Sequence, residues 1–95
     1  MKFDQLSRRQ ARMVLDLREN GPDCAKFISR RLGLHQAEVM EMLRELESSG
    51  WLERVKGTFL FKKGFRRPKH MNHTYYRISR PAEIELRALA RKGKI

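Results

Sequence analysis

The chain has 95 residues, with 22 Lys or Arg against 11 Asp or Glu, and its formal net charge at pH 7 is +11. This length predicts a single domain over residues 1–95 with one small hydrophobic core. The sequence lacks an apolar run of about 18 residues and a signal-peptide pattern, which argues against a membrane-bound or secreted protein. The lone cysteine, Cys24, fits a reducing, cytoplasmic environment.

The positive charge is concentrated in one part of the chain. Residues 1–53 hold nine basic and nine acidic side chains, so that half carries no net charge. Residues 54–95 hold thirteen Lys or Arg and only two Glu, and residues 54–82 hold no acid at all. A one-sided positive field attracts polyanions. A role in solubility is the alternative interpretation of the same charge.

The first predicted helix begins at Arg8. Ser7 followed three residues later by Gln10 is a capping-box pattern. The sequence Asn20-Gly21-Pro22 ends the helix. The expected apolar stripe has helical spacing and consists of Ala11, Val14 and Leu15, with Arg18 next in the series.

Two further helices are predicted before residue 50. The second covers about 23–32, with Asp23 as its cap, Gly33 as its C-cap and an apolar face made of Cys24, Ala25, Ile28 and Leu32. The third begins after His35, which is a poorer cap than Ser or Asp, with Glu38 three positions on. It ends at Ser48-Ser49-Gly50, and its apolar face is made of Val39, Leu43 and Leu46.

Alternating residues after Gly50 predict a strand over 51–62, and a β-rich segment predicts a second strand over 73–79. The two strands would form a hairpin with residues 63–72 at its tip. Pro68 fits this tip because it cannot donate to a strand ladder. Ser79-Arg80-Pro81 begins a last helix over about 81–91, with apolar residues on more than one side.

The short predicted second helix, the tight turn at Gly33 and the longer third helix have helix-turn-helix spacing. The stretch FISRRLGLHQAEVMEMLRELESSGWLERV resembles the winged helix-turn-helix domains of prokaryotic transcriptional regulators. The end of the hairpin, MNHTYYRISR, is similar to an uncharacterised archaeal winged-helix family. The resemblance implies an α+β winged helix, with the wing over about 51–79.

This resemblance implies binding of double-stranded DNA, with the third helix in the major groove, and a role in transcription regulation without catalysis. The implied contacts on the helix-turn-helix are Arg30, Arg31, Gln36, Ala37, Met40 and Arg44. The implied phosphate contacts on the wing are Lys62, Lys63, Arg66, Arg67 and Lys69. A homodimer through the N-terminal segment, near 1–6, and the last helix is expected, with Leu86 and Leu89 available for burial. No cofactor or metal is expected.

The third helix departs from the usual pattern because it is net acidic, and carboxylates near phosphates are repelled. Glu38, Glu41, Glu45 and Glu47 outnumber Arg44. Two other functions therefore stay open. One is an RNA- or ribosome-associated winged helix, and the other is a protein-interaction module that uses the acidic helix.

The remaining candidate residues favour ordinary structural roles. Phe59, Phe61 and Tyr75 are expected in the hairpin core and not on single-stranded bases, and Phe65 is the aromatic residue expected to be exposed. His70 and His73 alone do not make a metal site. Cys24 is expected to be a buried structural thiol. Lys63-Gly64-Phe65 resembles the start of an RNA-recognition-motif signature, but the next residues break it.

Overall fold

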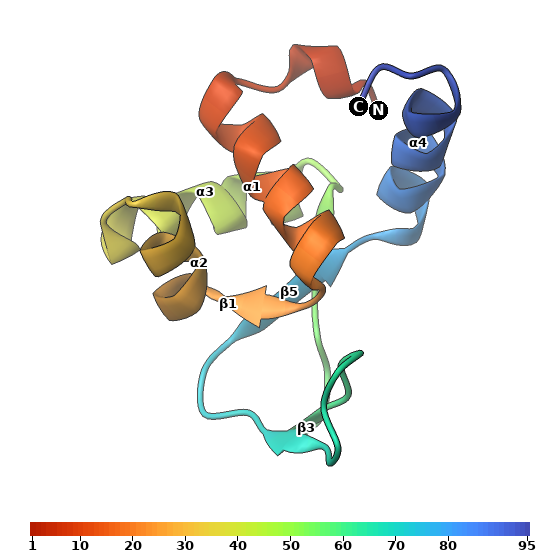
Figure 1. The fold of residues 1–95 in the computed structure, drawn as a ribbon. Helices are drawn as coiled ribbons and strands as arrows, with labels where there is room; N and C mark the ends of the chain where they lie inside the picture. Colours follow the sequence, from red (N-terminus) through yellow and green to blue (C-terminus); the bar gives the residue numbers. More distant parts are fainter.

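A computed structural model describes all 95 residues, and Figure 1 shows its fold. The α-helices lie on one side of a small antiparallel sheet, above it in this view, and a long arm of the chain extends from the other side. None of the helices is long and apolar enough to cross a lipid bilayer. In chain order the elements are η1 Phe3–Gln5, α1 Arg8–Asn20, β1 Asp23–Cys24, α2 Ala25–Leu32, α3 Gln36–Ser48, β2 Leu52–Arg54, β3 Phe59–Leu60, β4 Lys69–His70, β5 Tyr75–Ile78 and α4 Arg80–Arg91.

Helix α1 begins and ends as the sequence predicts. The Ser7 hydroxyl accepts from the Gln10 backbone N–H at 3.1 Å, and the Gln10 side chain accepts from the Ser7 N–H at 2.9 Å. The predicted apolar stripe is offset, however, because the buried residues of α1 are Met13, Val14 and Leu17. Ala11 and Leu15 are only half-buried. The helical period was right, but it does not tell which part of the apolar arc faces the core.

The second helix is shorter than predicted, because Asp23 and Cys24 form strand β1 instead of its first turn. β1 pairs with β5, so that Asp23 lies opposite Tyr76 and Cys24 opposite Tyr75. Asp23 therefore does not cap α2, which is the correction to the predicted helix start. Cys24 is a buried free thiol, as expected.

The turn between α2 and α3 has the predicted helix-turn-helix form. Gly33 takes a left-handed conformation with φ of +67°, which a residue with a side chain adopts only with strain. The Leu34 N–H donates to the Ser29 carbonyl at 3.1 Å and closes the turn. His35 precedes α3 without a side-chain capping bond, in keeping with its poor capping ability.

The predicted hairpin is divided between two sheets. Strand β2 pairs with β5, and this pair with β1 makes a three-stranded sheet of order β1-β5-β2. Strand β3 pairs with β4 in a separate ribbon, in which Phe59 lies opposite His70. The predicted continuous strand over 51–62 is therefore wrong, because the backbone leaves the first sheet at 55–58, where Gly57 has a φ of +99°. We call residues 55–74 the wing.

The main hydrophobic core joins all four α-helices to β2 and β5. Its members are Met13, Val14, Leu17, Ile28, Val39, Leu43, Leu46, Trp51, Leu52, Tyr76, Ile78, Ala82 and Leu86. A second, smaller cluster made of Cys24, Leu60 and Tyr75 lies at the root of the wing. The wing is thus attached to the body by a packed joint of its own.

Helix α4 begins where predicted, and the Ser79 hydroxyl accepts from the Ala82 N–H at 3.3 Å. The same hydroxyl donates to the Gly50 carbonyl at 2.6 Å. Leu86 is buried in the chain's own core, which corrects the expectation that it is free for a second copy. The two termini lie close together at the end of the molecule opposite the wing (Figure 1).

Candidate nucleic-acid interface

One face of helix α3 is anchored in the core and the other is open. Val39, Leu43 and Leu46 are buried against the body. The outward face consists of Gln36, Ala37, Met40, Glu41 and Arg44, all of which are exposed. These include every residue of α3 that the resemblance implied as a contact. The helical period alone brings them to one side, because the spacing places them on adjacent turns.

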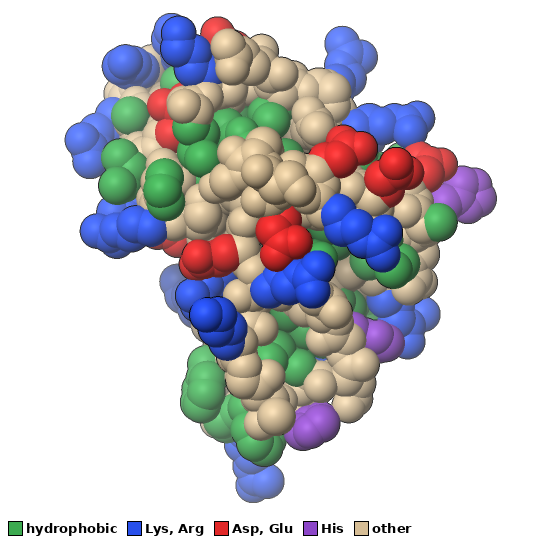
Figure 2. Space-filling model, turned by 180° about the vertical axis from the view of Figure 1, so that it is seen from behind, with side chains coloured by type: hydrophobic (Ala, Val, Ile, Leu, Met, Phe, Trp, Pro, Cys, Tyr) green, Lys and Arg blue, Asp and Glu red, His purple; other side chains and the backbone are tan.

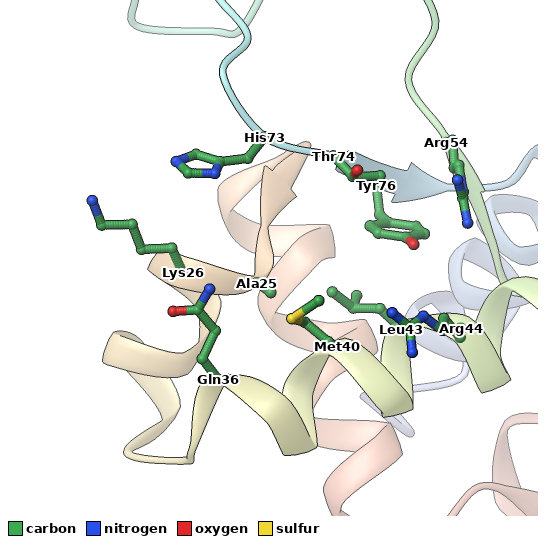
Figure 3. A pocket seen from close by; sticks show the side chains of 10 residues that line it. All are labelled: Ala25, Lys26, Gln36, Met40, Leu43, Arg44, Arg54, His73, Thr74 and Tyr76. Carbon is green, nitrogen blue, oxygen red and sulfur yellow. The ribbon is translucent and has the colours of Figure 1, made fainter.

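A groove of about 380 Å³ runs beside this face of α3. Figure 3 shows Gln36, Met40 and Arg44 on α3 at one wall of the groove, and His73 and Thr74, which lead into β5, at the opposite wall. Lys26 and Arg54 also line the groove, and neither was among the predicted contacts. No local signal identifies them, since α2 and β2 meet α3 only in the folded chain. His73 and Thr74 belong to the wing, so the groove joins α3 to it.

The acidity of α3 is offset by the rest of the chain. The Arg9 guanidinium pairs with Glu38 at 2.9 Å, and the Gln10 amide donates to Glu45 at 3.3 Å. Arg54 pairs with Glu47 at 3.0 Å, and this hydrogen bond raises the pKa of Arg54. Of the four glutamates, Glu41 alone takes no part in these contacts. The net charge of α3 read from sequence therefore overstates the negative charge that it presents to a partner.

Four of the five predicted wing cations are exposed and lie outside all the ion pairs of the protein. They are Lys63, Arg66, Arg67 and Lys69. The Lys69 ammonium lies 4.8 Å from the centre of the Phe27 ring on α2, where the attraction between cation and ring holds it. Arg30 is also exposed, with its guanidinium 5.7 Å from the same ring centre.

Two predicted contacts are instead held by carboxylates at the wing root. Arg31 binds Asp16 and Asp23, each at 2.7 Å, and Lys62 lies 3.7 Å from Asp23. The hydrogen bond to Asp16, and then the bond to Asp23, raise the pKa of Arg31 above its already high value. Asp23 also accepts from the Cys24 N–H at 2.8 Å. This four-residue network, Asp16–Arg31–Asp23–Lys62, ties α1 and α2 to the wing.

The aromatic residues of the wing and of the start of β5 are distributed differently from the prediction. Tyr75 is buried, as expected, but Phe59 is 52 % and Phe61 75 % exposed. Phe65 is 43 % exposed, so it is not the most exposed of the three. The prediction of a core role for Phe59 and Phe61 is wrong because the wing strands β3 and β4 pair apart from the main sheet. Phe59 and Phe61 consequently belong to neither hydrophobic cluster.

Tyr75, which begins β5 at the wing root, and His70 in the wing each have local partners. Burial, together with the neighbouring Cys24 thiol, raises the pKa of Tyr75 to about 12. The His70 ring lies edge-on to Phe59, with ring centres 5.5 Å apart, and its Nδ1 is 3.0 Å from Asn72 Oδ1. The protein gathers no group of three His, Cys, Asp or Glu that could hold a metal ion.

Solved structures from bacteria share this fold. AbfR of Staphylococcus epidermidis is 21% identical with a TM-score of 0.67, over 94% of this chain and 52% of that one. Rv1404 from Mycobacterium tuberculosis is 14% identical with a TM-score of 0.71, over 93% and 53% of the two chains. MarR from E. coli, in its apo form, is 13% identical with a TM-score of 0.66, over 92% and 57%.

These likenesses confirm the α+β winged-helix fold, and this chain spans little more than half the length of each of those proteins. No curated protein matches the chain. A family described as "Uncharacterized protein conserved in archaea (DUF2250)" matches residues 4–89, from η1 into α4. The chain belongs to this archaeal winged-helix family.

Proposed function

We propose that this protein binds double-stranded DNA and regulates transcription, with α3 in the major groove and the wing along the phosphate backbone or in a minor groove. The observation that carries the proposal is the set of free cations on the acid-free wing, which continues into the open face of α3 through the groove at His73 and Thr74. The solved likenesses include AbfR bound to DNA in its reduced form. The proposed activity is binding and not catalysis.

The chemistry of the outward face of α3 suits base recognition. Gln36 can bond adenine through its amide, and Arg44 can bond guanine or a phosphate. Glu41, which is left without an internal partner, can accept from the amino group of cytosine, and Met40 can touch a thymine methyl group. The remaining glutamates of α3 are bound by side chains of α1 and β2. These contacts reduce the repulsion between the carboxylates of α3 and the phosphates of DNA, which argued against placing α3 in the major groove.

The phosphate contacts divide into two groups. Lys63, Arg66, Arg67 and Lys69 are free to meet phosphates, and Arg30 can join them from α2. Arg31 and Lys62 remain proposed phosphate contacts. Because both already bind Asp23, we propose that their main role is to orient the wing. Lys26 and Arg54, which line the groove, are added to the predicted contacts.

A homodimer is part of the proposal, with the partner packed on the end of the molecule where the termini meet. Phe3 lies edge-on to Trp51, with ring centres 6.1 Å apart, and its N–H donates to Glu85 on α4 at 3.2 Å. The N-terminal segment and α4 therefore form one surface. Ile84 and Met1 are exposed hydrophobic residues there. Sedimentation of the protein against an Ile84→Lys variant tests this interface, and monomers in both samples would contradict it.

The test of the main proposal is binding to duplex DNA and duplex RNA of equal length and random sequence, across a salt series. The slope of log K against log salt is about −0.9 per phosphate neutralised on B-DNA. We expect tighter binding to DNA, with a slope that corresponds to at least the four free wing cations. Equal or tighter binding to RNA would favour the RNA-associated alternative, and no binding to either would favour a protein-interaction module.

A further inference from the structure

The wing tip carries an unusual concentration of exposed aromatic rings. Six large hydrophobic residues are exposed in the protein, and three of them, Phe59, Phe61 and Phe65, lie within one short segment of the wing. Figure 2 shows hydrophobic side chains gathered at the lower end of the molecule, where Figure 1 places the wing, with a Lys or Arg side chain below them. Exposed phenylalanine in water is unfavourable, so a partner that covers these rings would bind strongly.

Two of these rings border a hollow of about 500 Å³ at the tip of the wing. The Phe65 N–H donates to the Lys62 carbonyl at 3.0 Å, and Gly64 has a φ of +95°. Phe61 precedes this tight turn and Phe65 ends it, and both line the hollow. The rest of the lining is Lys62, Lys63, Arg66, Arg67 and Pro68, with no acidic residue.

The rings at this hollow are free of partners within the chain. The Phe59 ring contacts the His70 ring edge-on, and the Phe27 ring has cation–ring contacts with Lys26, Arg30 and Lys69. Neither Phe61 nor Phe65 takes part in a ring–ring or a cation–ring contact. The hollow thus combines open aromatic faces with nearby positive charge.

We propose that this hollow binds an unpaired nucleobase, which stacks on Phe61 and Phe65 while its flanking phosphates meet Lys63, Arg66 and Arg67. Every base has a planar face, and stacking on aromatic side chains beside a basic track is how proteins hold unpaired nucleotides. Bases in an intact duplex are already stacked and cannot enter. The inference rests on the proposed DNA binding and specifies a class of DNA that the protein binds best, namely duplex DNA with an unpaired or opened base.

An anionic bilayer is the other surface that exposed rings and cations would suit. The composition of the lining favours a single base over a bilayer. Its apolar part is limited to two rings and Pro68, beside four cations. Substitution by leucine separates the two. Leucine keeps the apolar volume that a bilayer accepts but removes the planar face that a base requires.

The first experiment compares two short duplexes of the same sequence, one fully paired and one with a single unpaired base, by fluorescence anisotropy. We expect the wild type to prefer the second by at least about fivefold, the lower limit for one stacked base. The Phe61→Leu/Phe65→Leu variant should lose the preference and keep its affinity for the paired duplex. Phe59→Leu is the matched control, since Phe59 is comparably exposed on the same wing but does not line the hollow, and it should keep the preference.

A second measurement reports stacking directly. In a Phe61→Trp variant the new indole is exposed, whereas Trp51 is buried in the core and gives a constant background. We expect the unpaired-base duplex to quench the exposed indole and the paired duplex to quench it much less.

The outcomes separate this inference from the proposed function. Wild-type binding to both duplexes with equal affinity, or a preference that persists in the double leucine variant, would overturn the inference and leave the DNA-binding proposal intact. No binding to either duplex would overturn both. Equal duplex affinities together with binding to phosphatidylserine–phosphatidylcholine vesicles by wild type and leucine variant alike would assign the rings to a bilayer and overturn the base-binding inference.

Discussion

Helix α3 and the wing are the two surfaces that we propose to meet DNA, and the chain leaves their charged groups in different states. Three of the four glutamates on α3 have a partner on α1 or β2. Four of the five cations clustered on the wing have no acidic partner. Contacts within the chain fix most of the charged side chains of α3, whereas the cations of the wing stay available to bind another molecule. We therefore expect affinity to come mainly from the wing and sequence preference from α3.

The largest expected effect tests the wing. Replacing Lys63, Arg66, Arg67 and Lys69 by Gln should reduce the salt slope by about 3.6, at about 0.9 for each phosphate contact. Extrapolated from 1 M to 0.1 M salt, this slope change corresponds to roughly a 4,000-fold weaker association with duplex DNA of any sequence. Anisotropy titrations across a salt series measure both quantities.

The matched control removes four cations from the opposite end of the molecule. Its residues are Lys2, Arg91, Lys92 and Lys94, all of which are exposed. If net charge alone drives binding, both variants will weaken it equally. That result would remove the distinction between the wing and the rest of the surface.

The packed joint at the wing root should be sensitive to alkaline pH through Tyr75. The phenol ionises near pH 10 in the unfolded chain and at about 12 in the folded one. Between these values the unfolded state binds fewer protons, so stability falls as pH rises through this window, by up to about 2.5 kcal/mol. Urea unfolding from pH 9 to pH 12 measures the decline. A Tyr75→Phe variant that declines as steeply as the wild type would show that other groups cause it.

A variant of the Asp16–Arg31–Asp23–Lys62 network tests whether ion pairs fix the wing to the rest of the protein. Asp23→Asn leaves Lys62 without its carboxylate and Arg31 with Asp16 alone. We expect the free energy of unfolding to drop by about 2 kcal/mol, less than for a fully buried pair because Arg31 is partly exposed. Urea unfolding measures it, with Asp4→Asn, an exposed carboxylate in η1, as the control. Equal stability of the two variants would mean that the network does not fix the wing.

The smallest expected effect belongs to α3 and concerns selectivity. Gln36→Ala and Arg44→Ala should each weaken a preferred site by about tenfold, within the range of one good base contact, and leave random duplex nearly unchanged. The preferred site is first selected from a random pool. Ser48→Ala, exposed at the end of the same helix, is the control. Uniform loss across all sequences would indicate that α3 contacts only phosphates.

Local signals in the sequence predicted most of the secondary structure. The capping pairs at Ser7 and Ser79, the left-handed Gly33 and the stop after Ser48 are set by residues within one or two turns, and each lies where predicted. The predicted start of α2 is wrong because Asp23 and Cys24 pair with β5, whose residues lie more than fifty positions away in the chain. Strand pairing over such a distance has no local signature.

The sequence by itself determined the helix-turn-helix pattern and the acid-free basic segment, because both depend on spacing and composition along the chain. Only the tertiary structure decided which charges are free. It placed Arg31 and Lys62 against Asp23, gave three glutamates of α3 their partners, and brought Lys26 and Arg54 to the groove that Gln36 also lines. It also left Phe61 uncovered. The physical reason is that pairing of charges and burial of rings depend on neighbours in space, which a linear pattern does not specify.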